Sequence, residues 1–416
     1  MHVAATLLKL ATRSLLNRRM TAALTVFAIA MSMTLFLGVE NLRKSARESF
    51  ETTLSGADLL VGARSGEVNL LLYAVFRLGN PTANLDWKSY QAIANRPEVA
   101  WTIPISLGDS VRGFRVIGTT QAYFDHYRYG NRRPLSFAQG APFDEVFDAV
   151  LGAQAAKDLG LSVGDPIILS HGIGGTSFVH HDDEPFRVSG ILDATGTPVD
   201  RAVHVSLAGL DAVHRPASAQ SAEERDSSGA FEPEAITAFL VGMHSRILTL
   251  RLQRQINTYR GEALSAVIPG VALAQLWQVV GAVEVVLGVI AGFVVVTGLL
   301  GMLTSILTSL NERRREMALL RAVGARPPAI FCLLVMEAGL LAGFGSLIGM
   351  ALVYVGFFAA APWVQSTYGI LIAPTGPGLH DLGIAGVVLL LALTLGAIPA
   401  WAAYRRSLAD GLSVQL

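Results

Sequence analysis

Residues 279–310 read VVGAVEVVLGVIAGFVVVTGLLGMLTSILTSL, and Glu284 is the single charged residue among them. A helix needs about 20 mostly apolar residues to cross the hydrocarbon core of a membrane, because unpaired backbone groups cannot remain in lipid. Three further stretches meet this requirement, and they are residues 20–39, 330–361 and 382–404. The sequence therefore predicts four membrane-spanning helices.

The charged residues are distributed unevenly along the chain of 416 residues. Residues 40–275 contain 47 of the 64 Asp, Glu, Lys and Arg residues, although 52% of the whole chain is hydrophobic and only 15% is charged. This distribution predicts a water-facing domain, residues 40–276, inserted between the first and second spans. The net charge of zero indicates no nucleic-acid partner. The single cysteine, Cys332, lies in an apolar run, so the domain must fold without disulfides.

Residues 40–276 alternate apolar runs with turn residues, which is typical of a mixed α/β domain. Strands are predicted at 57–61, 101–106, 112–118, 166–169, 186–191, 202–206 and 235–241, and helices at 87–94 and 152–159. The stretch 67–78, EVNLLLYAVFRL, is apolar but too short to span a membrane. We interpret it as a buried helix. The alternative is an amphipathic element at the membrane surface, beside a lateral opening for a lipidic substrate.

The basic residues that flank the spans predict the orientation, because Lys and Arg accumulate in short cytoplasmic segments. All eleven lie in residues 1–19, 311–328 and 405–416, whereas the loop at 362–381 has none. Both termini are therefore expected in the cytoplasm, with residues 40–276 outside. The first segment mixes leucines with basic residues, so it is either a helix in the cytoplasmic membrane interface or an extension of the first span.

The loop between the second and third spans contains the string ERRREMALLRAVGARPP, which begins at Glu312. Charged residues at 312–316 and 321 are interleaved with apolar residues at 317, 319, 320 and 323, and Gly324 and two prolines follow. This pattern predicts a short amphipathic helix that ends at the glycine. Such a helix can dock into a groove of a cytoplasmic partner. Alternatively, its arginines only anchor the loop at anionic headgroups.

Two carboxylates interrupt the predicted spans, Glu284 in the second and Glu337 in the third. A carboxylate within a membrane is costly and usually has a partner or a function. Because no Lys or Arg lies within a span, we interpret both as protonated or interfacial structural groups rather than a proton relay. Small residues of the third span favour close helix packing, and they are Gly339, Ala342, Gly343, Gly345, Ser346 and Gly349.

The loop string resembles the signature of the FtsX/MacB-type permeases of ABC transporters, the mechanotransmission class (type VII) that includes the four-span LolC/LolE-like permeases. The resemblance extends along the chain. LLNRR at 15–19 is similar to the family's N-terminal segment, and VLGAQAAKDLGLSVGD at 150–165 is similar to its periplasmic motif. Residues 186–193 and 200–207 resemble the two strands that follow. Residues 67–78 and 171–184 match no part of the family pattern.

The resemblance implies a homodimer bound to a dimer of a separate cytoplasmic ABC ATPase, in the lipids of the bacterial inner membrane. In this family ATP-driven closure of the ATPase moves the periplasmic domains, which here would act on a lipoprotein, a peptide or another amphiphile. The residues implied to contact the ATPase are Glu312, Arg313, Arg314, Arg315, Glu316, Met317, Leu320, Arg321, Gly324 and Ala325. The chain has no Gly-x-x-x-x-Gly-Lys-Ser/Thr motif, so ATP and Mg²⁺ are expected in the partner and no cofactor is expected in this chain.

Two alternatives to this function follow from the sequence. The first, within the same class, is an FtsX-like signalling permease that activates a periplasmic or envelope partner. The second is a membrane-anchored metal-binding protein or enzyme that uses residues 171–184. Zinc-type donors cluster there, and they are His171, His180, His181, Asp182 and Asp183. Their spacings match no metal signature, so a solvated loop without metal is the preferred interpretation. No catalytic residue is assigned, since Gly-x-Ser-x-Gly and His-Glu-x-x-His are absent.

Overall fold

The computed structural model divides the chain into two compact units. The helical unit comprises residues 1–44, 281–361 and 373–416, and the sheet unit comprises residues 45–280 and 362–372. The structure describes residues 2–171, 185–214, 233–312, 321–322, 324–368 and 376–409. Each unit is considered on its own below.

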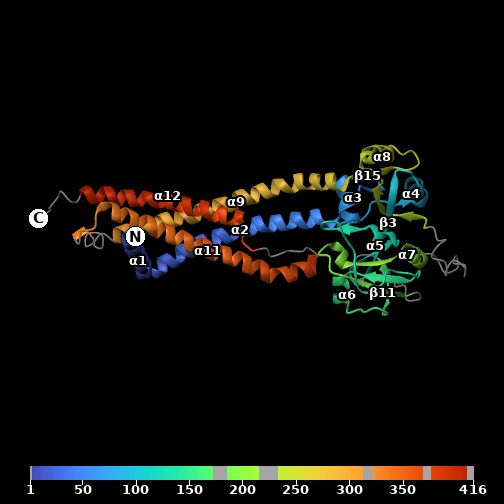
Figure 1. Cartoon of the computed structure of the whole chain (residues 1–416), viewed down its shortest axis with the longest axis horizontal. Helices are drawn as coiled ribbons and strands as arrows, with labels where there is room; N and C mark the ends of the chain where they lie inside the picture. The colour runs from blue at the N-terminus through green and yellow to red at the C-terminus, as the bar shows by residue number, and fades with distance from the viewer. Residues whose placement is uncertain are drawn as a thin grey trace. The chain divides into compact units, whose positions relative to one another are not determined.

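Long apolar helices dominate the helical unit (Figure 1). Its helices are α1 (His2–Asn17), α2 (Arg19–Thr53), α9 (Pro269–Glu312), α11 (Pro327–Tyr368) and α12 (Leu379–Ala409), of which α2, α9 and the last residues of α11 continue into the sheet unit. Within the described part of the chain, α2, α9, α11 and α12 are the four helices with the length and hydropathy needed to cross a membrane. Each contains one of the four predicted spans. The expectation of four transmembrane helices is therefore confirmed.

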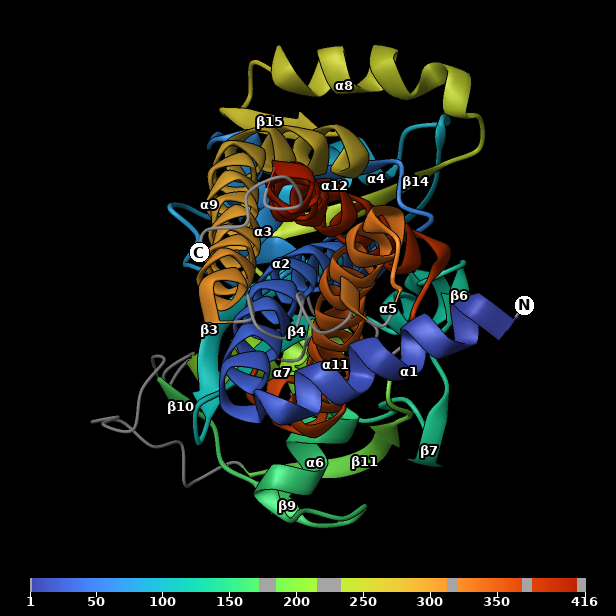
Figure 2. The same cartoon turned by 90° about the vertical axis from the view of Figure 1, so that its left-hand side faces the viewer.

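The N-terminal segment forms a helix of its own. α1 ends at Asn17, Arg18 is in a turn conformation, and α2 begins at Arg19. Figure 2 shows that α1 runs across the end of α2 rather than in line with it. The segment is therefore a separate helix rather than a simple extension of the first span, and its position in the membrane interface stays a prediction.

The small residues of α11 allow α2 to approach it closely. A side chain at Gly345 would lie 2.7 Å from Ile29, and one at Gly349 would lie 2.6 Å from the backbone oxygen of Ala30. The Thr34 hydroxyl donates a hydrogen bond to the backbone oxygen of Gly349 at 3.2 Å. Close backbone contact between small residues is a common way for helices to associate in membranes, where no hydrophobic effect drives them together.

The sheet unit contains short helices and many strands. The helices are α3 (Glu67–Ala74), α4 (Trp87–Ala94), α5 (Ala122–His126), α6 (Ala153–Leu159), α7 (Leu207–His214) and α8 (Thr249–Asn257), with the 3-10 turns η1 (Pro198–Arg201) and η3 (Arg246–Leu248). The strands are β1 (Leu59–Ala63), β2 (Leu85–Asp86), β3 (Val99–Val111), β4 (Phe114–Thr119), β5 (Arg128–Tyr129), β6 (Arg133–Pro134), β7 (Phe137–Gly140), β8 (Asp148–Leu151), β9 (Pro166–Ile167), β10 (Ser170–His171), β11 (Phe186–Leu192), β12 (Ala202–Ser206), β13 (Ala235–Ile236), β14 (Ala238–Met243) and β15 (Leu264–Val267).

One mixed sheet organises this unit. Among the described residues its strand order is β15-β1-β14-β3-β4-β12-β8-β11-β7, with β10 beside β3 and β9 beside β11. The pairs β12–β4 and β11–β8 are parallel. The long strand β3 joins the two halves of the sheet, because it pairs with β14 up to Ile105 and with β4 from Ser106 onward. The predicted mixed α/β domain between the first and second membrane helices is therefore confirmed.

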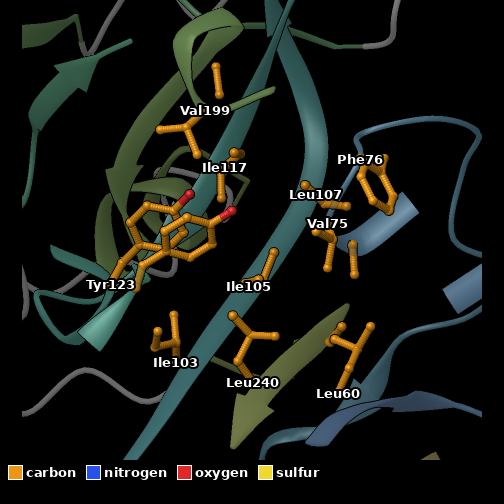
Figure 3. Packing of buried hydrophobic residues seen from close by; sticks show 14 of the residues in the cluster. Leu60, Val75, Phe76, Ile103, Ile105, Leu107, Ile117, Tyr123, Val199 and Leu240 are labelled. Carbon is orange, nitrogen blue, oxygen red and sulfur yellow. The ribbon is translucent and has the colours of Figure 1, made fainter. Parts of the chain in front are cut away.

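Aliphatic side chains of neighbouring strands form the main core of the sheet unit. Figure 3 shows Leu60, Ile103, Ile105 and Leu240 packed together, with Phe76 nearby. The apolar stretch at 67–78 contributes to this core, because its helix α3 buries Leu70, Leu71, Tyr73 and Ala74. The buried-helix interpretation of that stretch is confirmed, and the membrane-surface alternative is wrong.

The edge strand β15 is protected by a neighbouring helix. The Asn257 side chain of α8 accepts a hydrogen bond from the Ala266 amide at 2.6 Å and donates one to its carbonyl at 3.4 Å. The Gln253 amide donates a second bond to the same carbonyl at 3.1 Å. These side chains take the place of a further strand, which keeps the edge from pairing with another chain.

Candidate functional site

The structure describes only part of the predicted coupling loop. Glu312 is the last residue of α9. Residues 313–320 lie outside the described residues. This undescribed part of the loop contains six of the predicted contact residues: Arg313, Arg314, Arg315, Glu316, Met317 and Leu320. Arg321, Gly324 and Ala325 are described. The amide of Gly324 donates a hydrogen bond to the backbone oxygen of Arg321 at 2.9 Å. The role of these residues in ATPase contact stays a prediction.

Gly324 has the backbone conformation expected at the end of a helix. The φ angle of Gly324 is +100°, a backbone conformation that residues with a Cβ rarely adopt. Three residues later Pro327 begins α11, and proline is well tolerated at a first helical position because no intrahelical donor is needed there. The helix that the sequence predicts before this glycine stays a prediction, because residues 313–320 lie outside the described residues.

An ion pair lies at one end of the helical unit, the end from which the predicted coupling loop emerges. We call this end of the helical unit the loop end. Arg18, between α1 and α2, places Nη2 3.4 Å from Oε2 of Glu337 on α11. Glu337 is 1% exposed, and the Arg18 side chain is 23% exposed. The same Nη2 donates a hydrogen bond to the Ser14 hydroxyl at 3.4 Å. The pair therefore connects the junction of α1 and α2 to the third membrane helix.

A small polar cavity adjoins this ion pair. Its volume is about 20 Å³, which is room for roughly one water molecule. Its lining comes from α1, α2, α9 and α11, and the polar members are Arg18, Thr21, Ser305, Ser309 and Glu337. Helix α9 leads into the predicted coupling loop and α11 begins just after it, so two walls of this cavity belong to the helices that flank the loop.

The sequence interpretation of the two span carboxylates needs correction. Glu337 pairs with Arg18, and Glu284 lies 3.6 Å from Nη1 of Arg43. Each arginine lies just beyond an end of the predicted first span, so a search for basic residues within the spans misses both.

A second set of polar contacts lies at the opposite end of the helical unit. Arg43 of α2 contacts Glu40 at 2.5 Å as well as Glu284 of α9. His380 of α12 places Nε2 3.7 Å from Oε1 of Glu40. These groups tie α2 to α9 and α12, although each is partly solvent-exposed and contributes little stability by itself.

Asp381 provides the most deeply buried polar junction at this end. It is 6% exposed and accepts hydrogen bonds from the Tyr354 hydroxyl at 2.6 Å, the Gly378 amide at 2.9 Å and the Asn41 amide at 3.4 Å. These donors belong to α11, to the residue before α12, and to α2. A carboxylate at the first turn of α12 also interacts favourably with the helix dipole. The sequence analysis did not single out Asp381, although a lone carboxylate before an apolar run is a recognisable signal.

The sheet unit contains a buried histidine. His204 on β12 is 0% exposed, lies 4.9 Å from the Tyr123 ring, and has its Nδ1 3.3 Å from the backbone oxygen of Val150. Burial, followed by the positive charge of Arg77, lowers the pKa of His204 to about 3, against a smaller opposing effect of the hydrogen bond to Val150. The imidazole is therefore neutral at neutral pH.

His204 makes the stability of the sheet unit depend on pH. In the unfolded chain it titrates near pH 6.5, so between pH 6.5 and 3 the unfolded state binds a proton that the folded state does not. We expect the free energy of unfolding to fall by up to about 5 kcal/mol over this range. Hydrogen exchange of the β8 and β12 amides, followed as a function of pH, measures this fall in the free energy of unfolding. The H204L variant should lose most of this dependence of the free energy of unfolding on pH. The H244Q variant, which changes an exposed histidine, should retain it. Equal slopes in both variants would contradict the assignment.

The proposed metal donors are mostly outside the described residues. Residues 172–184 are not described, and His171 is described only as part of β10, whose backbone pairs with β3 at Asp109. In the part of the chain that the structure describes, no group of three or more His, Cys, Asp or Glu side chains could hold a metal ion. The polar contacts at both ends of the helical unit are therefore the site geometry that the described residues provide.

Comparison with known proteins gives matches along most of the chain. The family model described as the MacB-like periplasmic core domain matches residues 22–241, and the FtsX-like permease C-terminal model matches residues 288–408. Two similar relatives are named pyoverdine export ATP-binding/permease protein PvdT. The one from Pseudomonas aeruginosa is 27% identical over 283 residues, 63% of this chain and 38% of the relative. The one from Pseudomonas savastanoi pv. phaseolicola is 24% identical over 277 residues, 63% of this chain and 39% of the relative.

Two solved structures are also similar. The periplasmic region of MacB from Actinobacillus actinomycetemcomitans is 13% identical, with a TM-score of 0.34, and the match covers 53% of this chain and 94% of that one. The extracellular domain of the noncanonic ABC-type transporter YknZ from Gram-positive bacteria is 15% identical, with a TM-score of 0.32, and the match covers 50% of this chain and 98% of that one. The periplasmic-domain model alone spans more than half of the chain. The chain therefore belongs to the MacB/FtsX-type permeases of ABC transporters.

Proposed function

We propose that this permease couples ATP hydrolysis by a separate cytoplasmic ATPase to movement of the sheet unit in the periplasm. The moving unit would act on a lipoprotein, a peptide or another amphiphile without passing it through a pore. The curated relatives are named for pyoverdine export and for ATP binding, and this chain spans 38–39% of their length. The cargo class of this chain is therefore part of the proposal.

The observation that carries the proposal is the continuity of two helices. α2 is 35 residues long and α9 is 44 residues long, which corresponds to about 50 Å and about 65 Å at 1.5 Å per residue. Both exceed the length that crosses a membrane, and both join the helical unit to the sheet unit without a break. A rigid helix transmits displacement along its axis, which a flexible linker would absorb.

Contacts along α2 and α9 support their action as a pair. In the helical unit the Ser32 hydroxyl donates a hydrogen bond to the backbone oxygen of Val294 at 3.1 Å, and Arg43 contacts Glu284. In the sheet unit the Trp277 ring lies 5.8 Å from Phe50, edge to face, and 5.9 Å from the Arg47 guanidinium. These contacts favour concerted movement of the two helices.

The assembly we propose has two copies of this chain and an ATPase dimer that binds ATP and Mg²⁺. Both termini and the loop at 311–328 would be cytoplasmic, because the basic residues of the short segments that flank the spans lie there and the short loop at 362–381 has none. The loop would contact the ATPase through Glu312 and Arg321 and the residues between them. The chain itself has no phosphate-binding glycine-lysine motif, so nucleotide chemistry would belong to the partner.

Hydrogen exchange in a reconstituted complex tests this function. The chain and the ATPase are placed in nanodiscs, and exchange of the β1 and β15 amides is compared with ATP, with ADP and without nucleotide. We expect ATP to change exchange in the sheet unit, although nucleotide binds on the other side of the membrane. Unchanged exchange in the sheet unit, with active hydrolysis, would contradict the proposal.

A matched pair of insertions distinguishes transmission through the helices from indirect effects. Two glycines inserted after Lys44 interrupt α2, whereas two glycines inserted between Arg112 and Gly113 lengthen the exposed turn between β3 and β4. The first insertion should abolish the ATP-dependent change in exchange, because glycine breaks helical continuity. The second should leave it intact.

A further inference from the structure

The segment from η3 through α8 presents two opposite faces. Positions 247, 250, 251 and 254 follow the i, i+3, i+4, i+7 spacing that brings side chains to one face of a helix. The other face contains Thr249, Leu252 and Ile256, which are buried against the rest of the sheet unit. Figure 2 shows α8 beside the edge strand β15. The face with the four spaced positions is therefore turned away from the sheet.

Two aliphatic side chains on this face are open to solvent. Ile247 is 90% exposed and Leu250 is 67% exposed. Ile247 is the most exposed large hydrophobic side chain among the described residues of the sheet unit. Burial of such side chains is favourable, and the sheet unit gains nothing from this pair as it stands.

Arginines accompany the two aliphatic side chains. Arg251 and Arg254 lie on the same face and are exposed, and Arg260 is exposed shortly after the helix. Residues 244–261 contain four arginines and no Asp or Glu. In the described part of the chain, only Arg246 of these four has an ion pair, with Asp58 at 3.4 Å. The surface formed by Ile247, Leu250, Arg251 and Arg254, which we call the α8 surface, is thus basic and apolar.

We propose that the α8 surface docks a separate protein whose binding face is acidic and contains an apolar recess for Ile247 and Leu250. Arginine is enriched among the interface residues that contribute most to binding, and exposed aliphatic side chains beside it gain from burial in a partner. The planar guanidinium also binds carboxylates with two parallel hydrogen bonds. A lipid surface is less suitable, because interfacial helices have a longer apolar face, usually with Trp or Phe, and residues 244–261 contain neither. This inference concerns a periplasmic partner and does not depend on the ATPase contact.

Fluorescence anisotropy with a defined probe tests the α8 surface. The probe is a fluorescein-labelled synthetic helical peptide with glutamates and leucines on one face, added to the full chain in nanodiscs of zwitterionic lipid. The wild-type chain should bind it, and a matched peptide with lysine in place of glutamate should not bind. R251E combined with R254E should weaken binding by about tenfold or more, which is about 1.4 kcal/mol. L250S should weaken it as well.

A matched variant controls for net charge and for folding. R133E combined with R187E changes the same number of exposed arginines elsewhere in the sheet unit and should bind the peptide like the wild type. Thermal unfolding of all variants should be unchanged, because the substituted side chains are exposed. The proposal is wrong if the acidic peptide does not bind, or if it binds both double variants equally.

Two further results would reassign the α8 surface and overturn the proposal. An environment-sensitive dye on I247C, in a C332S background, would shift on transfer from zwitterionic to anionic nanodiscs without peptide if the surface binds lipid. Cross-linking from the same cysteine to a second copy of the chain would indicate self-association. With an acidic protein partner, the dye responds only when the acidic peptide is added.

Discussion

Reversal of two charges in the predicted coupling loop, R314E with R315E, is expected to lower ATP-driven activity by about tenfold or more. Removing one partner of a charge pair at an interface typically costs 2–5 kcal/mol, and reversal adds repulsion. The chain should still insert in the membrane, because other basic residues at 1–19 and 405–416 maintain the orientation signal. ATP hydrolysis by the reconstituted complex, measured with and without the double change, checks this expectation.

A matched double change separates docking from anchoring at headgroups. K9E with R13E reverses two charges in the N-terminal segment, on the same predicted side of the membrane. If the loop arginines only anchor the loop to anionic lipids, the two double variants should lose similar activity. If the loop contacts the ATPase, the loop variant alone should lose coupling. Full ATPase stimulation by the loop variant would refute the docking assignment.

The second large effect is expected at the loop-end ion pair. R18L would leave the carboxylate of Glu337 buried, at 1% exposure, without its guanidinium partner. Removing one member of a buried ion pair typically costs 3–5 kcal/mol. We therefore expect a large drop in the unfolding temperature of the purified chain, measured in one detergent for all variants.

The double variant R18L with E337L isolates the interaction between the two side chains. Replacing both members of a buried pair by apolar residues is often neutral, so the double variant should recover much of the stability that R18L loses. R13L, which removes an exposed arginine from α1, is the matched control and should have little effect. If R18L and R13L behaved alike, the contact between Arg18 and Glu337 would have no energetic importance.

The membrane helices could be predicted from sequence, but their ends could not. Hydropathy placed the first span at 20–39, whereas α2 continues to Thr53. Hydropathy reports where a helix meets lipid, and a helix that continues into water has polar side chains. Local pairs support that extension, such as Arg47 with Glu51 at 2.8 Å, one turn apart. The added length is what makes α2 a candidate transmitter of movement.

In the sheet unit, strands with long apolar runs were predicted and short ones were missed. The strand at 202–206 was predicted with its observed bounds, but β8 and β15, four residues each, were not. Both are held by neighbours distant in sequence: β8 pairs with β11 and β12, and β15 pairs with β1. Pairing with distant strands, rather than local preference, determines such short elements.

The partners of the polar groups could not be derived from local sequence. Arg18 and Glu337 are 319 positions apart, and Asn41 and Asp381 are 340 positions apart. Sequence reasoning correctly marked Glu337 as costly in a membrane, but it searched for a partner within the spans. Positions just beyond the ends of the predicted first span, where basic residues are tolerated, supplied both arginines. His204 gave no signal at all, because its burial follows from the sheet topology.

The accessibility of one cysteine tests the central claim, that the loop between α9 and α11 is a cytoplasmic handle for an ATPase. A325C in a C332S background is treated with a membrane-impermeant maleimide in intact spheroplasts, in lysed membranes, and in lysed membranes with added ATPase. We predict no labelling in intact spheroplasts, labelling after lysis, and protection by the ATPase. Labelling of intact spheroplasts, or no protection by the ATPase, would contradict the account.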